Sequence, residues 1–250
     1  MLTTTTTLDP AGPEFYREHG YWLHRKPVFS AEKFERLRAL FEEIAATRGA
    51  KRMDELDTPH FAEPRLFEFL LADEVLDVVQ PIIGPNIGLW SSHFICKEPR
   101  TGRATPWHTD ADYWKGRFDR FDAIVTMWLA LDPSDKENGC MKVIPGTHKG
   151  EGFEYSAVDA NRNLFDKEIS GQTFSDADAV YFELQPDECS LHDSRIAHGA
   201  EANTSPRRRC GYTMRYFDLG MKVTGGPINE GFKVWHARGE NVGGNPLEYL

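Results

Sequence analysis

The chain contains 250 residues, of which 40% are hydrophobic and 27% are charged, a composition typical of a protein that buries a large core. Its formal net charge of −10 opposes binding to nucleic acids and to anionic membrane surfaces, so we expect neither as a partner. No segment has the length of a membrane-spanning apolar helix, and the first residues lack the pattern of a signal peptide. One globular domain is the expected organisation.

Two helical regions are predicted in the first third of the chain. The first follows Ser30, a good N-cap residue, and has a stop signal at Gly49. Its apolar residues recur at helical spacing, at Phe34, Leu37, Phe41 and Ile44. The second region covers 64–71 and then 74–80, where Pro81 and a following glycine are expected to end it.

Short β-rich segments separated by turn residues occupy the middle of the chain. They are 87–96, 123–131, 141–144, 179–182 and 209–217. With helices gathered at the front, this pattern predicts a mainly β protein with peripheral helices, built as a double-stranded β-helix (jelly-roll, cupin-like) barrel. The predicted parts of the single domain 1–250 are a flexible start at 1–10, a mainly helical part at 11–85, a barrel core at 86–220 and a C-terminal extension at 221–250.

The four cysteines, Cys96, Cys140, Cys189 and Cys210, stand far apart and form no CxxC pair. This spacing favours reduced, buried thiols over a disulfide framework or a zinc site. A cytoplasmic location is therefore expected.

Among the nine histidines, only His108 stands two residues before a carboxylate, that of Asp110. On an extended strand, residues i and i+2 point to the same face, so these two side chains can bind one metal ion. A solvated pair at a strand end is the alternative, because such triplets also occur by chance.

A histidine from the segment 191–203 would complete a set of two imidazoles and one carboxylate on one face of an octahedron. Such a set leaves three positions open and is typical of non-haem iron(II) oxygenases. Zinc is the rival occupant, but closed zinc sites prefer four protein ligands, often cysteines, and no cysteine here has the spacing. The segment contains both His192 and His198.

Longer motifs surround these residues. They are Phe15-Tyr16-Arg17-Glu18-His19-Gly20-Tyr21, Pro106-Trp107-His108-Thr109-Asp110-Ala111-Asp112-Tyr113-Trp114, Trp128-Leu129-Ala130-Leu131-Asp132, Glu137-Asn138-Gly139-Cys140-Met141-Lys142-Val143-Ile144-Pro145-Gly146-Thr147-His148, and His198-Gly199 with Asn203. In this order they resemble the phytanoyl-CoA dioxygenase family of iron(II)- and 2-oxoglutarate-dependent oxygenases, which includes ectoine hydroxylase. The resemblance spans residues 12–220 and implies iron(II), 2-oxoglutarate and O₂ as cofactor and co-substrates, with ascorbate as a stimulant.

The resemblance assigns the metal to His108, Asp110 and His198, because the family places a non-ligating histidine six residues before the ligand. It also places the arginine that binds the distal carboxylate of 2-oxoglutarate eleven residues after the last ligand, at Arg209. A guanidinium suits this task because it is always charged and binds a carboxylate through two parallel hydrogen bonds. Strand alternation puts Arg207 on the same face, so the family spacing decides between the two.

Three further residues are implied as part of the site. Thr126 resembles a hydroxyl position that contacts 2-oxoglutarate, although an ordinary strand threonine is the alternative. Tyr113 and Trp114 resemble a substrate-contacting position of ectoine hydroxylase, with core packing as the alternative. Lys97 is expected at the surface, with a position near the cofactor pocket as the alternative.

The sequence predicts an enzyme that hydroxylates an unactivated C–H bond of a small metabolite, releasing succinate and CO₂. Halogenases of this type replace the carboxylate by a small residue, and the chain keeps Asp110. The segments 49–62 and 151–175 are the expected lid and pocket segments. A cupin-like metal enzyme that does not use 2-oxoglutarate and a non-catalytic small-molecule-binding β-barrel are the alternatives.

Overall fold

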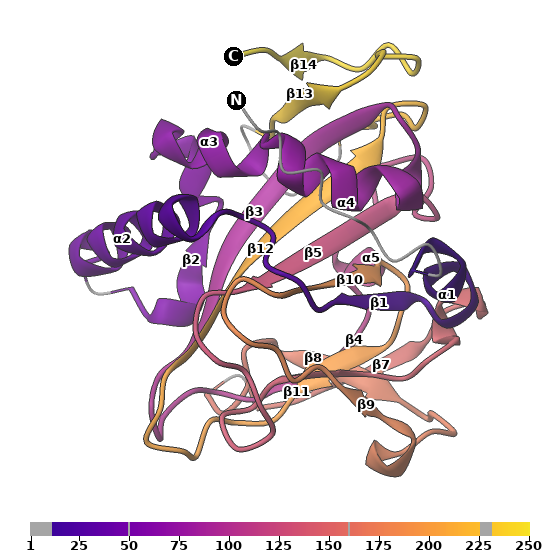
Figure 1. Ribbon diagram of the computed structural model, residues 1–250. Helices are drawn as coiled ribbons and strands as arrows, with labels where there is room; N and C mark the ends of the chain where they lie inside the picture. Colours follow the sequence, from indigo (N-terminus) through magenta and orange to yellow (C-terminus); the bar gives the residue numbers. More distant parts are fainter. Residues whose placement is uncertain (1–11, 50, 160, 226–231) are drawn as a thin grey trace.

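The computed structural model describes residues 12–49, 51–159, 161–225 and 232–250 (Figure 1). The segment 1–10, which we expect to be flexible, lies outside these ranges. Within them, no helix combines the length and the apolar character that crossing a membrane requires.

The larger sheet has eight strands. They are β1 (Tyr21–His24), β2 (Leu56–Asp57), β3 (Ile87–Lys97), β5 (Ile124–Ala130), β10 (Cys189–Asp193), β12 (Arg209–Asp218), β13 (Val234–Arg238) and β14 (Leu247–Glu248). Their order is β1-β10-β5-β12-β3-β13-β14, with β2 also paired to β3. All pairings are antiparallel except that between β13 and β14.

The second sheet has four strands, which are β4 (Thr105–His108), β6 (Met141–Val143), β9 (Val180–Tyr181) and β11 (His198–Ala200). Their order is β4-β11-β6-β9, and a separate hairpin pairs β7 (Glu154–Ala157) with β8 (Lys167–Ser170). Figure 1 shows this sheet below the larger one. Side chains from both sheets line one cavity, so the sheets face each other across it.

Five α-helices accompany the sheets in the described part of the chain. They are α1 (Gly12–His19), α2 (Ala31–Thr47), α3 (Phe67–Leu70), α4 (Asp73–Ile83) and α5 (Asp110–Tyr113). Short 3-10 turns lie at Met53–Glu55, Pro59–Phe61, Pro64–Leu66, Thr147–Lys149 and Asp176–Asp178. Figure 1 shows α2, α3 and α4 on the side of the larger sheet that faces away from the second sheet.

The first predicted helix is confirmed as α2, and the hydroxyl of Ser30 accepts the backbone N–H of Lys33 at 3.3 Å, as an N-cap does. The second region is confirmed as the turn before α3 together with α3 and α4. The predicted stop at Gly84 is confirmed, but Pro81 does not end the helix, because α4 continues to Ile83. A proline this close to the end of a helix removes only one intrahelical hydrogen bond, so the last turn still forms.

All five predicted strands are confirmed, as β3, β5, β6, β9 and β12. Side chains alternate along β12. Tyr212, Met214 and Tyr216 enter the core under the helices, whereas Arg209 and Arg215 face the cavity. One strand therefore serves both the core and the cavity.

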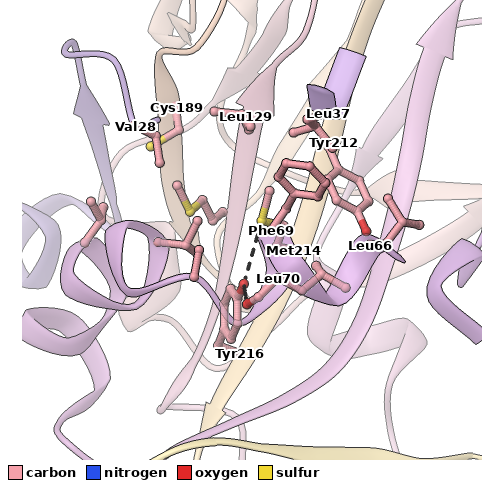
Figure 2. Close-up of a cluster of buried hydrophobic side chains, with 14 of the residues drawn as sticks. Val28, Leu37, Leu66, Phe69, Leu70, Leu129, Cys189, Tyr212, Met214 and Tyr216 are labelled. Carbon is pink, nitrogen blue, oxygen red and sulfur yellow. Dashed lines mark hydrogen bonds between the residues drawn. The ribbon is translucent and has the colours of Figure 1, made fainter. Parts of the chain in front are cut away.

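The main hydrophobic core lies between the helices and the outer face of the larger sheet. Figure 2 shows Leu37, Leu66 and Phe69 packed close to Tyr212 and Met214 of β12. The phenol of Tyr216 donates a hydrogen bond to the backbone carbonyl of Leu70 at 2.7 Å, so it joins β12 to α3. Burying each such side chain contributes about 1.5–3 kcal/mol, and this layer fixes the position of β12.

The prediction that all four cysteines are reduced is wrong. Cys96 of β3 and Cys210 of β12 are direct cross-strand partners and form a disulfide, whereas Cys140 and Cys189 are free and buried. The two bonded cysteines are 114 residues apart in sequence, but separation along the chain says nothing about distance between neighbouring strands. The cysteine pattern thus no longer supports a cytoplasmic location, which stays a prediction.

Asp187 is a buried carboxyl that does not line the cavity. It has a positive φ of 69° and accepts the backbone N–H of Phe29, with both oxygens at 3.2 Å. Burial raises the pKa of Asp187 to about 7, although its hydrogen bond to Phe29 acts in the opposite direction. The folded chain therefore holds this proton more tightly than the unfolded chain, whose carboxyl has a pKa of 3.8. Folding must become less favourable as the pH rises between these two values.

We expect the free energy of unfolding of Asp187→Asn to exceed that of the wild type by about 2 kcal/mol at about pH 8, so that the variant unfolds at a higher urea concentration. This difference should disappear toward about pH 4. Asparagine tolerates a positive φ and keeps an acceptor for Phe29. Urea unfolding of the metal-free protein at both pH values measures the effect, because no metal then contributes. A variant that is less stable than the wild type at pH 8 would contradict this assignment.

Candidate metal centre

Three predicted residues, His108, Asp110 and His198, meet at one end of the cavity. His108 ends β4 and His198 begins β11, and the two are direct cross-strand partners with ring centroids 4.0 Å apart. Oδ1 of Asp110 lies 3.9 Å from Nε2 of each histidine. One ligand atom from each of the three buried side chains lies within 4.8 Å of the others. Two distant parts of the chain thus form one compact donor set.

Asp110 is not on the strand, contrary to our prediction of an extended segment through both residues. β4 ends at His108, Thr109 is still extended, and Asp110 is the first residue of α5. The extended conformation of Thr109, with φ −114° and ψ 140°, is sufficient to direct the carboxylate back toward the imidazole.

Both histidines are oriented in the same way. Nδ1 of His108 lies 2.8 Å from the carbonyl of Pro106, and Nδ1 of His198 lies 3.0 Å from the carbonyl of Ile196. Because a carbonyl can only accept, each Nδ1 carries the proton and each Nε2 keeps a free lone pair. Such hydrogen bonds fix the ring orientation and tautomer of metal-binding histidines.

The charge states also suit a metal site. Burial lowers the pKa of His108 and of His198, so both rings are neutral at neutral pH. Burial alone would raise the pKa of Asp110, but the neighbouring His192 and the charge of Arg215 hold it well below its usual range. Two neutral imidazoles and one carboxylate are the set that a non-haem iron(II) ion takes.

Arg209 lies at the other end of the cavity and is only 2% exposed. Its guanidinium stands 4.9 Å from the centre of the Trp128 ring, and its Nε and Nη1 have no partner in the part of the chain that the structure describes. Burial lowers the pKa of Arg209 to about 10, so the group is charged at neutral pH. A buried cation with free donors fits the distal carboxylate of 2-oxoglutarate.

The neighbouring arginines point elsewhere. Arg207 pairs with Asp135 at 2.8 Å, and Arg208 pairs with Asp132 at 2.7 Å. Neither lines the cavity, so among these three residues the structure leaves only Arg209 able to reach a ligand there.

Lys97 is buried, contrary to our prediction of a surface lysine, with 2% exposure. Its ammonium donates to the backbone carbonyls of Arg103, Ala200 and Glu201, and burial lowers its pKa well below the usual range. Lys97 is the cross-strand partner of Arg209, so alternation along β3 already places it on the inner face.

The structure places the three remaining predicted residues around this donor set. Thr126 lines the cavity, and its hydroxyl donates to Oδ2 of Asp110 at 3.0 Å. The ring of Tyr113 lies 5.8 Å from that of His108, and Trp114 is buried in a small aromatic cluster. Tyr113 and Trp114 are not among the residues that line the cavity, and substrate contact by either stays a prediction.

The cavity also contains residues to which the sequence analysis gave no individual role. His192 lines it, with Nε2 3.5 Å from Oδ2 of Asp110, which is longer than a good hydrogen bond. Leu164 and Phe165, from a segment that we expected to form a lid, close one side. Arg215 also lines the cavity, and counting in steps of two from Arg209 along the predicted strand would have found it.

Comparison with known proteins agrees with this geometry. The family model named Phytanoyl-CoA dioxygenase (PhyH) matches residues 16–211. The chain is 24% identical over 208 residues to the "Phytanoyl-CoA dioxygenase domain-containing protein 1 homolog" of Caenorhabditis elegans, covering 78% of this chain and 72% of that protein. It is 31% identical over 160 residues to "Phytanoyl-CoA dioxygenase, peroxisomal" of Mus musculus, covering 55% of this chain but only 46% of that protein.

Among solved structures, the chain is similar to SnoK, a "non-heme alpha ketoglutarate dependent carbocyclase" from nogalamycin biosynthesis. The TM-score is 0.69 and the identity 25%, with 89% of this chain and 88% of that chain covered. This likeness confirms the predicted double-stranded β-helix fold.

Proposed function

Because the chain belongs to the phytanoyl-CoA dioxygenase family, whose members are iron(II)- and 2-oxoglutarate-dependent dioxygenases, we propose that it hydroxylates an unactivated C–H bond of a small metabolite. The observation that carries the proposal is the donor set of His108, Asp110 and His198 in one cavity with the unpartnered Arg209. A cupin-like enzyme without 2-oxoglutarate has no need of a buried arginine in this position.

In this proposal the three donors would hold iron(II), and Arg209 would bind the distal carboxylate of 2-oxoglutarate. Bound iron and 2-oxoglutarate together supply the oxidation of the substrate by O₂, with release of succinate and CO₂. Ascorbate is the expected stimulant. Asp110 occupies the position that a halogenase would need free for chloride, which supports hydroxylation.

The protein's own contribution is orientation and exclusion of water. The carbonyls of Pro106 and Ile196 fix the two rings, and the hydroxyl of Thr126 holds Oδ2 of Asp110. Trp128 lies against the guanidinium of Arg209, which limits its rotation. The same Thr126 hydroxyl is a candidate contact for 2-oxoglutarate, since its lone pairs stay available.

The aromatic side chains beside the metal would form the wall nearest the substrate. We assign this role to Tyr113 and Trp114, which lie three and four residues after Asp110, and the ring of Tyr113 lies 5.8 Å from that of His108. Phe165 lies 4.8 Å from the ring of Tyr113 and 4.7 Å from that of His108, so it shields both from solvent.

The test is succinate formation from 2-oxoglutarate by the full chain, with and without iron(II). We expect iron-dependent conversion even without a primary substrate, at a slow uncoupled rate, and its loss on adding a chelator. Anaerobic titration with 2-oxoglutarate provides a second measurement. An iron-loaded protein that neither binds 2-oxoglutarate nor forms succinate would favour the cupin-like enzyme or the non-catalytic barrel.

A further inference from the structure

A second arginine, Arg215, faces the cavity from the same strand as Arg209. On β12, Arg215 is the cross-strand partner of Thr126 on β5 and of Ser91 on β3. Thr126 holds Asp110, so Arg215 stands at the metal end of the cavity, whereas Arg209 stands six residues away along the strand. The proposed function assigns a ligand to Arg209 but none to Arg215.

The hydrogen bonds of Arg215 are incomplete. Its Nη1 donates to the hydroxyl of Ser91 at 3.0 Å, but its buried Nε has no acceptor in the described ranges. No carboxylate of the described residues lies within 4.0 Å of the guanidinium. A guanidinium that is partly removed from water without an anionic partner is costly, so an outside partner is favoured.

The surroundings of Arg215 are aromatic and rich in donors. The guanidinium lies 5.4 Å from the ring of Trp114 and 6.0 Å from that of Trp90. The buried indole N–H of Trp90 also lacks an acceptor among the described residues, and Arg117 stands 5.2 Å over the Trp90 ring. Asp57, a nearby carboxylate, is 3.6 Å from His93. The Nε of Arg215 and the indole N–H of Trp90, both without an acceptor, thus lie close to the positive charges of Arg215 and Arg117.

The charges of the cavity lead to the same conclusion. The charged side chains that line it are Asp110, Arg209 and Arg215. The charges of iron(II) and of the 2-oxoglutarate dianion cancel, and Asp110 cancels Arg209. Arg215 then leaves one positive charge in a site that largely excludes water, and a substrate with one negative charge restores neutrality.

We propose that Arg215 binds an anionic oxygen group, a carboxylate or a phosphate, of the primary substrate. This inference rests on the proposed function and narrows its substrate to anionic metabolites. The guanidinium would bind the anion through Nε and its neighbouring N–H, while Trp90 and Trp114 pack against the adjacent carbon atoms. Because Arg215 stands beside Asp110, a carbon a few bonds from the anionic group would then lie near the metal.

The rival role for Arg215 is binding the metal-bound end of 2-oxoglutarate. The two roles differ in which ligand is lost when the charge is removed. Loss of substrate anchoring leaves 2-oxoglutarate affinity intact, whereas loss of a co-substrate contact lowers it.

The test uses the full chain loaded with iron(II) and 2-oxoglutarate without O₂. The probes are phenylacetate with its neutral amide, propionate with its amide, and inorganic phosphate, and binding is followed by tryptophan fluorescence and calorimetry. We expect at least one anion to bind about tenfold or more tightly than the neutral amides. Arg215→Gln should reduce this preference to less than about twofold, Arg215→Lys should retain part of it, and 2-oxoglutarate affinity should change by less than about threefold in both.

Arg120→Gln is the matched control, because Arg120 is an exposed arginine paired with Asp122 and Asp218. We expect this variant to change neither the affinity for the anionic probes nor that for 2-oxoglutarate. A tenfold loss of 2-oxoglutarate affinity in Arg215→Gln would overturn this inference but not the proposed function. A wild type that binds no anion better than the amides would do the same. A wild type that binds no 2-oxoglutarate would overturn the proposed function and this inference together.

Discussion

Replacing His198 by alanine should abolish iron(II) binding and iron-dependent succinate formation while leaving the fold intact. Nε2 of His198 and Nε2 of His108 each lie 3.9 Å from Oδ1 of Asp110, so removing one ring leaves a two-ligand site. Because even partners of metal ligands change affinity by about 10–100-fold, we expect at least about 100-fold for a ligand itself. Anaerobic metal titration measures this, and circular dichroism checks the fold.

His192→Gln is the matched control for this experiment. His192 also lines the cavity, but its closest approach to Asp110 is 3.5 Å and it lies outside the compact donor set. We expect its replacement to lower iron affinity by about tenfold at most. The reverse order, with His192→Gln losing iron and His198→Ala retaining it, would move the third ligand to His192.

Arg209→Gln should bind iron(II) normally but lose 2-oxoglutarate affinity by about 100-fold or more. A buried ion pair that loses one partner costs about 3–5 kcal/mol, because the other charge stays unpaired. Arg209→Lys should recover little of the 2-oxoglutarate affinity, since an ammonium cannot form two parallel hydrogen bonds with a carboxylate. The lysine would also have to take the position beside Trp128 that the guanidinium occupies. Calorimetric titration of the iron-loaded protein with 2-oxoglutarate provides the measurement.

Arg207→Gln removes the same charge two residues away and serves as the control. Its guanidinium is exposed and paired with Asp135 and Glu137, so 2-oxoglutarate affinity should stay within about twofold of the wild type. Should Arg207→Gln weaken 2-oxoglutarate binding and Arg209→Gln leave it unchanged, the anchor would be Arg207. Without 2-oxoglutarate, Arg209→Gln should melt no earlier than the wild type, because it removes an unpaired buried charge.

Local patterns predicted the elements of the fold that depend on local interactions. The apolar spacing after Ser30 predicted α2, and alternation with turn residues predicted β3, β5 and β12. The stop of α4 at Pro81 was mispredicted because a single lost hydrogen bond at Pro81 is outweighed by burial of Ile83 against the core. Helix propensity describes one residue at a time, whereas packing against the core decides where a helix such as α4 ends.

Properties that depend on strand pairing could not be read from the sequence. The register that makes Cys96 the partner of Cys210 also makes Lys97 the partner of Arg209, and neither pairing leaves a local signal. The metal ligands were predicted from a family resemblance, because the residue types alone did not distinguish His192 from His198. Strand alternation could have placed Arg215 in the cavity, but its lack of a carboxylate partner depends on tertiary contacts that the sequence does not show.

The two-sided character of β12 restricts how the cavity can change. Tyr212 and Tyr216 fix its outer face under the helices, so removing one residue from the strand would turn Arg215 toward the core and an aromatic ring toward the cavity. New substrate preferences in relatives of this chain should therefore arise by point replacement within 209–218. Changes in length should be confined to segments outside the strands of the two sheets, where gaining or losing residues leaves the register of β12 untouched.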